Sequence, residues 1–164
     1  MMIPCAKNLR KSAYLPINYD AIYEESRQTF LHAIKPESKK PLTPIKILIV
    51  EDTEICQKIA LLTFNQPTYV TDLATSGKEA LEKYSQGYDV ILLDLGLPDM
   101  SGIDVCKHIR KKIGDTRTPI IAYSTISDTL HEECLAAGFS ETLMKPTEKK
   151  VLYQFIKELV EKAS

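Results

Sequence analysis

The sequence predicts an α/β fold in which a doubly wound parallel sheet is covered by helices on both faces. Short apolar runs alternate with amphipathic segments five times after residue 44. The run at 90–93 is apolar without interruption, as expected of a strand buried on both faces. Charged and hydroxyl residues follow several of the runs, and α/β sheets place their ligands at such strand ends.

The strands are predicted at 45–50, 69–74, 89–93, 118–123 and 141–144. Helices are predicted from 54 to about 66, from 76 to 87, from 101, from 127 to 137, and from 147 onward. Right-handed crossovers restrict such a chain to doubly wound topologies, and we expect the flavodoxin-like strand order 2-1-3-4-5.

Local signals fix several helix ends. Ser76 and Glu79 have the spacing of a capping box, Gly138 is placed to end a helix, and Thr147 to cap the last one.

The first helix of this domain carries apolar residues at helical spacing. Ile55, Ile59 and Leu62, together with Phe64, are predicted to face the sheet.

Residues 1–43 are predicted to form an N-terminal extension to the main domain at 44–164. An amphipathic helix is expected at about 18–35, because apolar and charged residues separate onto different faces there. The following segment is rich in proline and lysine, as expected of a linker. This helix could dimerise the protein, dock on its own domain or fold only on a partner.

Composition narrows the function classes. The 164 residues carry a net charge of -1, which provides no general attraction to nucleic acids or membranes. The four cysteines are far apart, so reduced thiols are more plausible than a zinc site. No apolar run approaches the length of a membrane span, and no signal peptide is evident. A cytoplasmic protein is therefore expected.

Five side chains are expected to converge at one edge of the sheet. Glu51 and Asp52 follow the first strand, Asp94 the third, Ser124 the fourth and Lys145 the fifth. Three crowded carboxylates favour a bound cation, and their hard oxygens suit Mg²⁺. A metal and an ammonium group around one carboxylate form the electrostatic surroundings that phosphoryl transfer needs.

The segment from about 45 to 162 resembles the receiver domains of two-component response regulators. The similarity rests on the apolar strand 47–50 with its acidic pair Glu51-Asp52, on 92–102, on 119–124, and on Met144-Lys145-Pro146. The CheY-like fold of these domains is the architecture expected above.

The resemblance implies a role for each of six residues. Asp94 would accept the phosphoryl group. The ligands of Mg²⁺ or Mn²⁺ would be Asp52, Asp94 and the Gly96 carbonyl, with Glu51 acting through water. Ser124 and Lys145 would hold the phosphoryl group. The donor would be a sensor histidine kinase or a histidine phosphotransfer protein. A phosphorylation-dependent homodimer is a further expectation, whereas nucleic-acid binding, membrane insertion and turnover of a separate substrate are not expected.

Two features depart from the family pattern. Thr142 stands where many receivers have a switch aromatic, three residues before the lysine, and Tyr123 or Phe139 are the candidates to replace it. The chain also ends directly after the last helix, at Ser164, so a stand-alone receiver is expected, although residues 55–60 more closely resemble the receivers of hybrid sensor kinases.

Two other functions compete with the receiver. One is a non-phosphorylated pseudo-receiver scaffold that acts through its N-terminal helix. The other is a phosphoaspartyl hydrolase, which ranks last because Gly96 occupies the place of the second acid.

Overall fold

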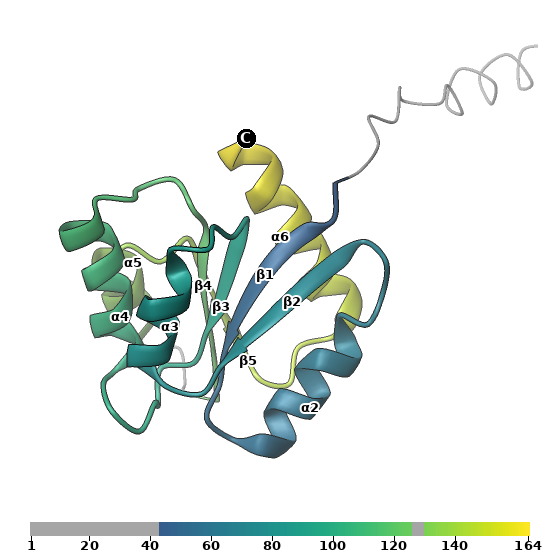
Figure 1. Ribbon diagram of the computed structural model, residues 1–164, viewed down its shortest axis with the longest axis horizontal. Coiled ribbons are helices and arrows are strands. Elements are labelled where there is room, and N and C mark those ends of the chain that lie inside the picture. Colours follow the sequence, from purple (N-terminus) through teal and green to yellow (C-terminus); the bar gives the residue numbers. More distant parts are fainter. Residues whose placement is uncertain (1–42, 126–129) are drawn as a thin grey trace, which may run out of the picture. The chain divides into compact units, whose positions relative to one another are not determined.

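The computed structural model describes residues 43–125 and 130–164, which contain a five-stranded parallel sheet (Figure 1). Its strands are β1 (Ile45–Val50), β2 (Tyr69–Ala74), β3 (Val90–Leu93), β4 (Ile120–Ser124) and β5 (Glu141–Met144). They lie in the order β2-β1-β3-β4-β5, so the predicted topology is confirmed. The predicted N-terminal helix and linker, and the start of the helix expected at 127, lie outside the described residues.

The helices are α2 (Glu54–Thr63), α3 (Gly77–Tyr84), α4 (Gly102–His108), the π-helical turn η1 (Ile109–Ile113), α5 (His131–Ala137) and α6 (Lys149–Ala163). Helices α2 and α6 cover one face of the sheet, and α3, α4 and α5 cover the other (Figure 1). Across the parts of the chain that can be described, no helix combines the length and apolarity needed to cross a membrane.

The core consists of two apolar layers separated by the sheet. Ile47, Val90 and Ile121 contribute to the layer under α2 and α6, while Leu48 and Ile91 contribute to the opposite layer. All five are at most 1% exposed. Alternate residues of the central strands therefore anchor opposite helical layers, which explains why these strands are apolar throughout.

Helix α2 is rotated relative to the sequence prediction, which was wrong for three residues. Ile55, Ile59 and Leu62 are 61%, 57% and 69% exposed, respectively. The half-buried positions of this helix include Cys56, Ala60 and Thr63 instead. This second stripe has an equally good helical spacing, so periodicity alone could not choose between the two.

An aromatic cluster at the end of α2 fixes this rotation. Phe64 is 2% exposed, and its ring centroid lies 5.3 Å from that of Tyr69 and 5.9 Å from that of Tyr153. The Tyr153 hydroxyl donates to the Thr63 carbonyl and accepts from the Gln66 amide at 2.6 Å. Because Phe64 is buried among these rings at the end of α2, it sets which side of the helix faces the sheet.

Two of the three predicted helix-end signals are confirmed. Ser76 Oγ accepts a hydrogen bond from the Glu79 backbone N–H at 3.2 Å, and Gly138 ends α5 with a φ of 106°. Thr147 does not cap α6, because its hydroxyl donates to the Met144 carbonyl at 2.6 Å and Glu148 takes the capping position.

The rotation of α2 predicts a contrast between two of its neighbouring positions. Phe64→Ala should lower the free energy of unfolding by about 3 to 5 kcal/mol, because it leaves a cavity among aromatic rings. Leu62→Ala, on the solvent face, should change that free energy by less than about 0.5 kcal/mol. Urea unfolding of both variants measures the difference, and equal losses would show that the assigned faces are incorrect.

Candidate functional site

The sheet itself positions the polar residues at its carboxyl edge. Pairing of Val50 with Leu93 places the next residues, Glu51 and Asp94, side by side. The Asp94 backbone N–H donates to the Val50 carbonyl at 3.0 Å, and the Lys145 N–H donates to the Ser124 carbonyl at 2.9 Å. Backbone hydrogen bonds of the ladder thus continue into the site, which holds its side chains on rigid strand ends.

Lys145 is the centre of the side-chain contacts. Its Nζ donates to Asp94 Oδ2 at 2.7 Å and also to Glu51 Oε2. The side chains of Lys145, Glu51 and Asp94 are only 11%, 5% and 13% exposed. A buried ammonium shared by two carboxylates satisfies charges that would be costly to leave unpaired. The peptide bond between Lys145 and Pro146 is cis.

These contacts shift the pKa of both partners. Burial by itself raises the pKa of Asp94, but hydrogen bonds from Lys145, from the Gly96 N–H and from the Ser124 hydroxyl hold it below its usual value. Burial likewise lowers the pKa of Lys145, but the bonds to Asp94 and Glu51 raise it overall. Asp94 is therefore an ionised carboxylate near neutral pH, and Lys145 is a fixed cation.

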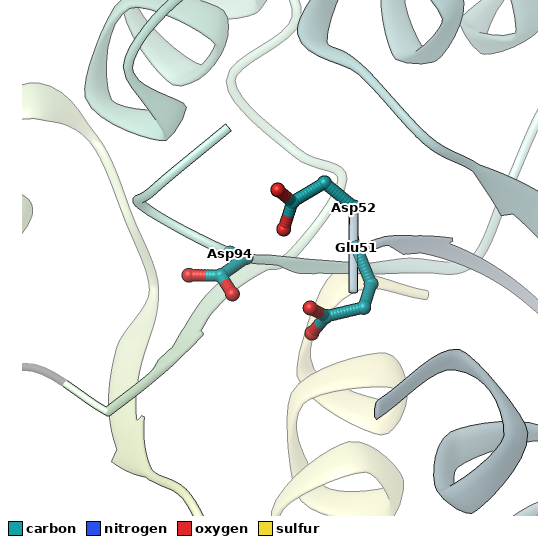
Figure 2. A group of neighbouring side chains, drawn as sticks. All are labelled: Glu51, Asp52 and Asp94. Carbon is teal, nitrogen blue, oxygen red and sulfur yellow. The ribbon is translucent and has the colours of Figure 1, made fainter. Parts of the chain in front are cut away.

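Three carboxylates share the space above the sheet. One oxygen from each of Glu51, Asp52 and Asp94 lies within 4.8 Å of the others, and Figure 2 shows these side chains around a common region. Asp52 is exposed, whereas Glu51 is buried and bonded to Lys145. The net negative charge and hard oxygen donors fit Mg²⁺, which retains several waters and needs only a few protein ligands.

Hydrogen bonds from backbone N–H groups hold the loop after Asp94 at both of its ends. The Gly96 N–H donates to Asp94 Oδ1 at 3.1 Å, and the Gly102 N–H donates to the Leu95 carbonyl at 3.0 Å. A Cβ atom on Gly102 would lie 2.2 Å from the Asp94 carbonyl oxygen, so only glycine fits there. The two carboxylate oxygens of Asp99 accept from the N–H groups of Gly77 and Lys78, each at 2.8 Å, which joins the loop to α3.

Two residues contribute to the site without having been singled out from sequence. Gln57 Nε2 donates to the Glu51 carbonyl at 2.8 Å, and the Thr53 N–H donates to Glu51 Oε1 at 3.2 Å. Both contacts hold the acidic turn against the start of α2. A glutamine one turn into a helix has no distinctive spacing, so the sequence offered no signal for it.

The candidates for the missing switch aromatic have different environments. Phe139 is 4% exposed and belongs to the core, whereas the Tyr123 ring centroid lies 5.4 Å from Lys145 Nζ. Thr142 hydrogen-bonds His131 Nδ1 through its hydroxyl. Of the two aromatics, Tyr123 is therefore the one in contact range of the site.

Comparison with known proteins points to one family. The model of the response regulator receiver domain matches residues 47–157. The aerobic respiration control sensor protein ArcB of Escherichia coli is 32% identical over 146 residues, which covers 88% of this chain and 18% of that protein. The response regulator ArlR of Staphylococcus saprophyticus is 36% identical over 117 residues, covering 70% of this chain and 52% of that protein. The chain thus spans about half or less of these relatives.

Solved structures give the same result. The receiver domain of the Francisella response regulator 1452 has a TM-score of 0.67 at 29% identity, covering 73% of this chain and 99% of that one. The receiver domain of the Pseudomonas aeruginosa sensor histidine kinase PA1611 has a TM-score of 0.66 at 28% identity, with coverage of 73% and 99%. That structure contains a magnesium ion coordinated in its active-site cleft.

The Lys145 contacts predict how Asp94 titrates. In Lys145→Met the pKa of Asp94 should rise, because burial remains while the bonded cation is lost. The depressed pKa of wild-type Asp94 stabilises the fold above the carboxyl's unfolded pKa, and this contribution is lost as the pH falls through the folded pKa. Carboxyl NMR titration of wild type and variant measures the shift. Lys78→Met is the control, since that side chain is 79% exposed.

The carboxylate cluster predicts the source of metal affinity. Asp52→Asn should weaken Mg²⁺ binding by about tenfold or more, because a hard anionic ligand is replaced by a neutral amide. Isothermal titration measures the affinity. Asp104→Asn is the control: it removes an exposed carboxylate at the start of α4 and should leave the Mg²⁺ affinity unchanged. Equal affinities in wild type and Asp52→Asn would place the ion elsewhere.

Proposed function

The chain belongs to the response regulator receiver domain family of two-component signalling, and from this premise we propose that Asp94 accepts a phosphoryl group from a phosphohistidine in a Mg²⁺-dependent reaction. The observation that carries this proposal is the ion pair between Asp94 and Lys145, with the Gly96 N–H on the same carboxylate. The signal then passes through altered protein contacts or by onward transfer of the phosphoryl group.

The reaction is a transfer between two protein side chains. An oxygen of the Asp94 carboxylate attacks phosphorus while the phosphorus–nitrogen bond of the donor breaks, so the imidazole leaves with the electron pair of that bond. The product is an acyl phosphate on Asp94. Because the hydrogen bonds from Lys145, Gly96 and Ser124 keep Asp94 ionised, the nucleophile needs no general base.

The surrounding groups stabilise the charge on the transferred phosphoryl group. Lys145 supplies a fixed ammonium, and the Ser124 hydroxyl lies at the end of the neighbouring strand. Asp52, Asp94 and the Gly96 carbonyl would hold Mg²⁺, with Glu51 acting through water, and the ion would neutralise negative charge on the phosphoryl oxygens. The Gln57 and Thr53 bonds to Glu51 keep the acidic turn in place for this role.

The partner follows from the chemistry. A sensor histidine kinase or a histidine phosphotransfer protein presents the required phosphohistidine, and the family relatives include both sensor proteins and response regulators. The receiver would catalyse only its own phosphorylation and dephosphorylation. A phosphorylation-dependent homodimer and a cytoplasmic location remain predictions. The complete set of Asp94, Lys145 and the acidic pair supports this function over a non-phosphorylated scaffold.

The proposal predicts the outcome of phosphodonor labelling. Asp94→Asn should abolish the single phosphate that acetyl phosphate and Mg²⁺ add to the wild-type protein, because an amide is not a competent nucleophile. Intact-mass spectrometry measures this addition directly. Asp104→Asn should be labelled like wild type. Undiminished labelling of Asp94→Asn would assign the phosphate to another residue and refute the proposed acceptor.

A further inference from the structure

A cavity of about 250 Å³ lies beneath α2, between this helix, the sheet and α6. Its walls include Cys56, Ala60 and Thr63 of α2, Ile49 and Leu92 of the sheet, and Leu152 of α6. The space exists because the sheet-facing stripe of α2 consists of small side chains, while the larger Ile55 and Leu62 are exposed and Ile59 lies at the edge of the cavity. Cores normally contain few voids larger than a water molecule.

The helix over the cavity is held mainly at its two ends. Near its start, Gln57 donates to the Glu51 carbonyl at 2.8 Å. Beyond its last turn, Phe64 packs against Tyr69 and Tyr153. Between these anchors Ala60 contributes only a methyl group to the space above Ile49 and Leu92. The aromatic cluster therefore keeps α2 from collapsing onto the sheet at its centre.

The charged groups of the cavity wall are paired with one another. Lys145, Glu51 and Asp94 close one end, and Lys145 bonds both carboxylates. Within residues 43–125 and 130–164, no buried polar side-chain atom lacks a hydrogen-bond partner. Water in a cavity needs two to four polar partners, and a charged ligand would be desolvated against walls that are mostly hydrocarbon. The wall thus favours an occupant that is uncharged and apolar.

The size of the cavity limits the occupant further. A dry apolar cavity of roughly 150 Å³ binds benzene. The present cavity, at about 250 Å³, has room for a molecule with two fused rings. Ile59 lines it and is 57% exposed, so the rim is open to solvent.

We propose that this cavity is a binding site for a small, neutral, apolar molecule of about the size of indole. The occupant lies against the sheet under Ala60, with its far edge toward the Lys145 ion pairs. This site adjoins the carboxylate cluster, because Glu51 and Asp94 close one end of it, but its other walls are mostly hydrocarbon and Asp52 is not among them.

Indole itself is a suitable probe, because the protein contains no tryptophan and indole emission can be excited apart from tyrosine. Titration of the full chain should give a saturable blue shift of this emission with one site per protein. Tryptamine and indole-3-acetate carry the same rings with a positive or a negative charge. Both should bind at least about tenfold more weakly than indole, because their charge would be desolvated against walls that are mostly hydrocarbon.

Substitutions on α2 locate the site. Ala60→Leu fills the cavity and should weaken indole binding by about tenfold or more. Leu62→Ala, on the solvent face of the same helix, is the matched control and should bind like wild type. If Ala60→Leu does not fold, as judged by circular dichroism, Cys56→Leu fills the same space from the previous turn.

Methyl NMR provides a readout that does not depend on variants. Indole should shift the methyl resonances of Ile49, Leu92 and Leu152, which line the cavity from two sides. The absence of a saturable shift, unchanged binding by the filled variant, or tighter binding of either charged analogue would each overturn the proposal. All of these measurements are made on the unphosphorylated protein, so none of them requires Asp94 to be a phosphoacceptor.

Discussion

The ion pairs of Lys145 with Asp94 and Glu51 are the interaction on which the rest of the site depends. Three crowded carboxylates at the end of a buried sheet repel one another, and two of them, Glu51 and Asp94, have lost most of their hydration. Lys145, itself mostly buried, satisfies two of them from the end of a different strand. Without this ammonium the edge of the sheet would hold an uncompensated negative charge.

The same arrangement serves stability and chemistry. Hydrogen bonds that hold the pKa of Asp94 low keep it anionic, which is the state that the proposed attack on phosphorus requires. The remaining negative charge, contributed largely by Asp52, stays exposed at the rim where a hydrated cation can reach it. The parallel sheet makes this possible because it brings strand ends that are far apart in the chain to one edge.

Helix α2 shows how local packing modifies this common framework. Its inner stripe consists of small residues, and the aromatic cluster lies at its end. Phe64 attaches the helix to the body of the domain, while Gln57 attaches it to the acidic turn. The result is a helix that supports the site at one end and encloses apolar space along its middle. A larger residue at position 60 would have removed that space.

The sequence by itself determined the strand order and the polar residues that end each strand. Uninterrupted apolar runs such as 90–93 have only one stable environment, a strand buried on both faces, and right-handed crossovers leave few ways to connect such strands. Because the ends of parallel strands lie at one edge of the sheet, the sequence alone predicts that Asp94 and Lys145 are close together.

Only the tertiary structure decided which face of α2 is inward, because two stripes of similar apolar spacing compete and the choice depends on the partners of Phe64. It also decided that Lys145 bonds Glu51 as well as Asp94, and that Gln57 reaches the Glu51 carbonyl. The structure also shows that the Thr147 hydroxyl donates to the Met144 carbonyl, three residues earlier, instead of capping α6. Side-chain contacts between distant elements depend on rotation and distance, and a one-dimensional pattern contains neither.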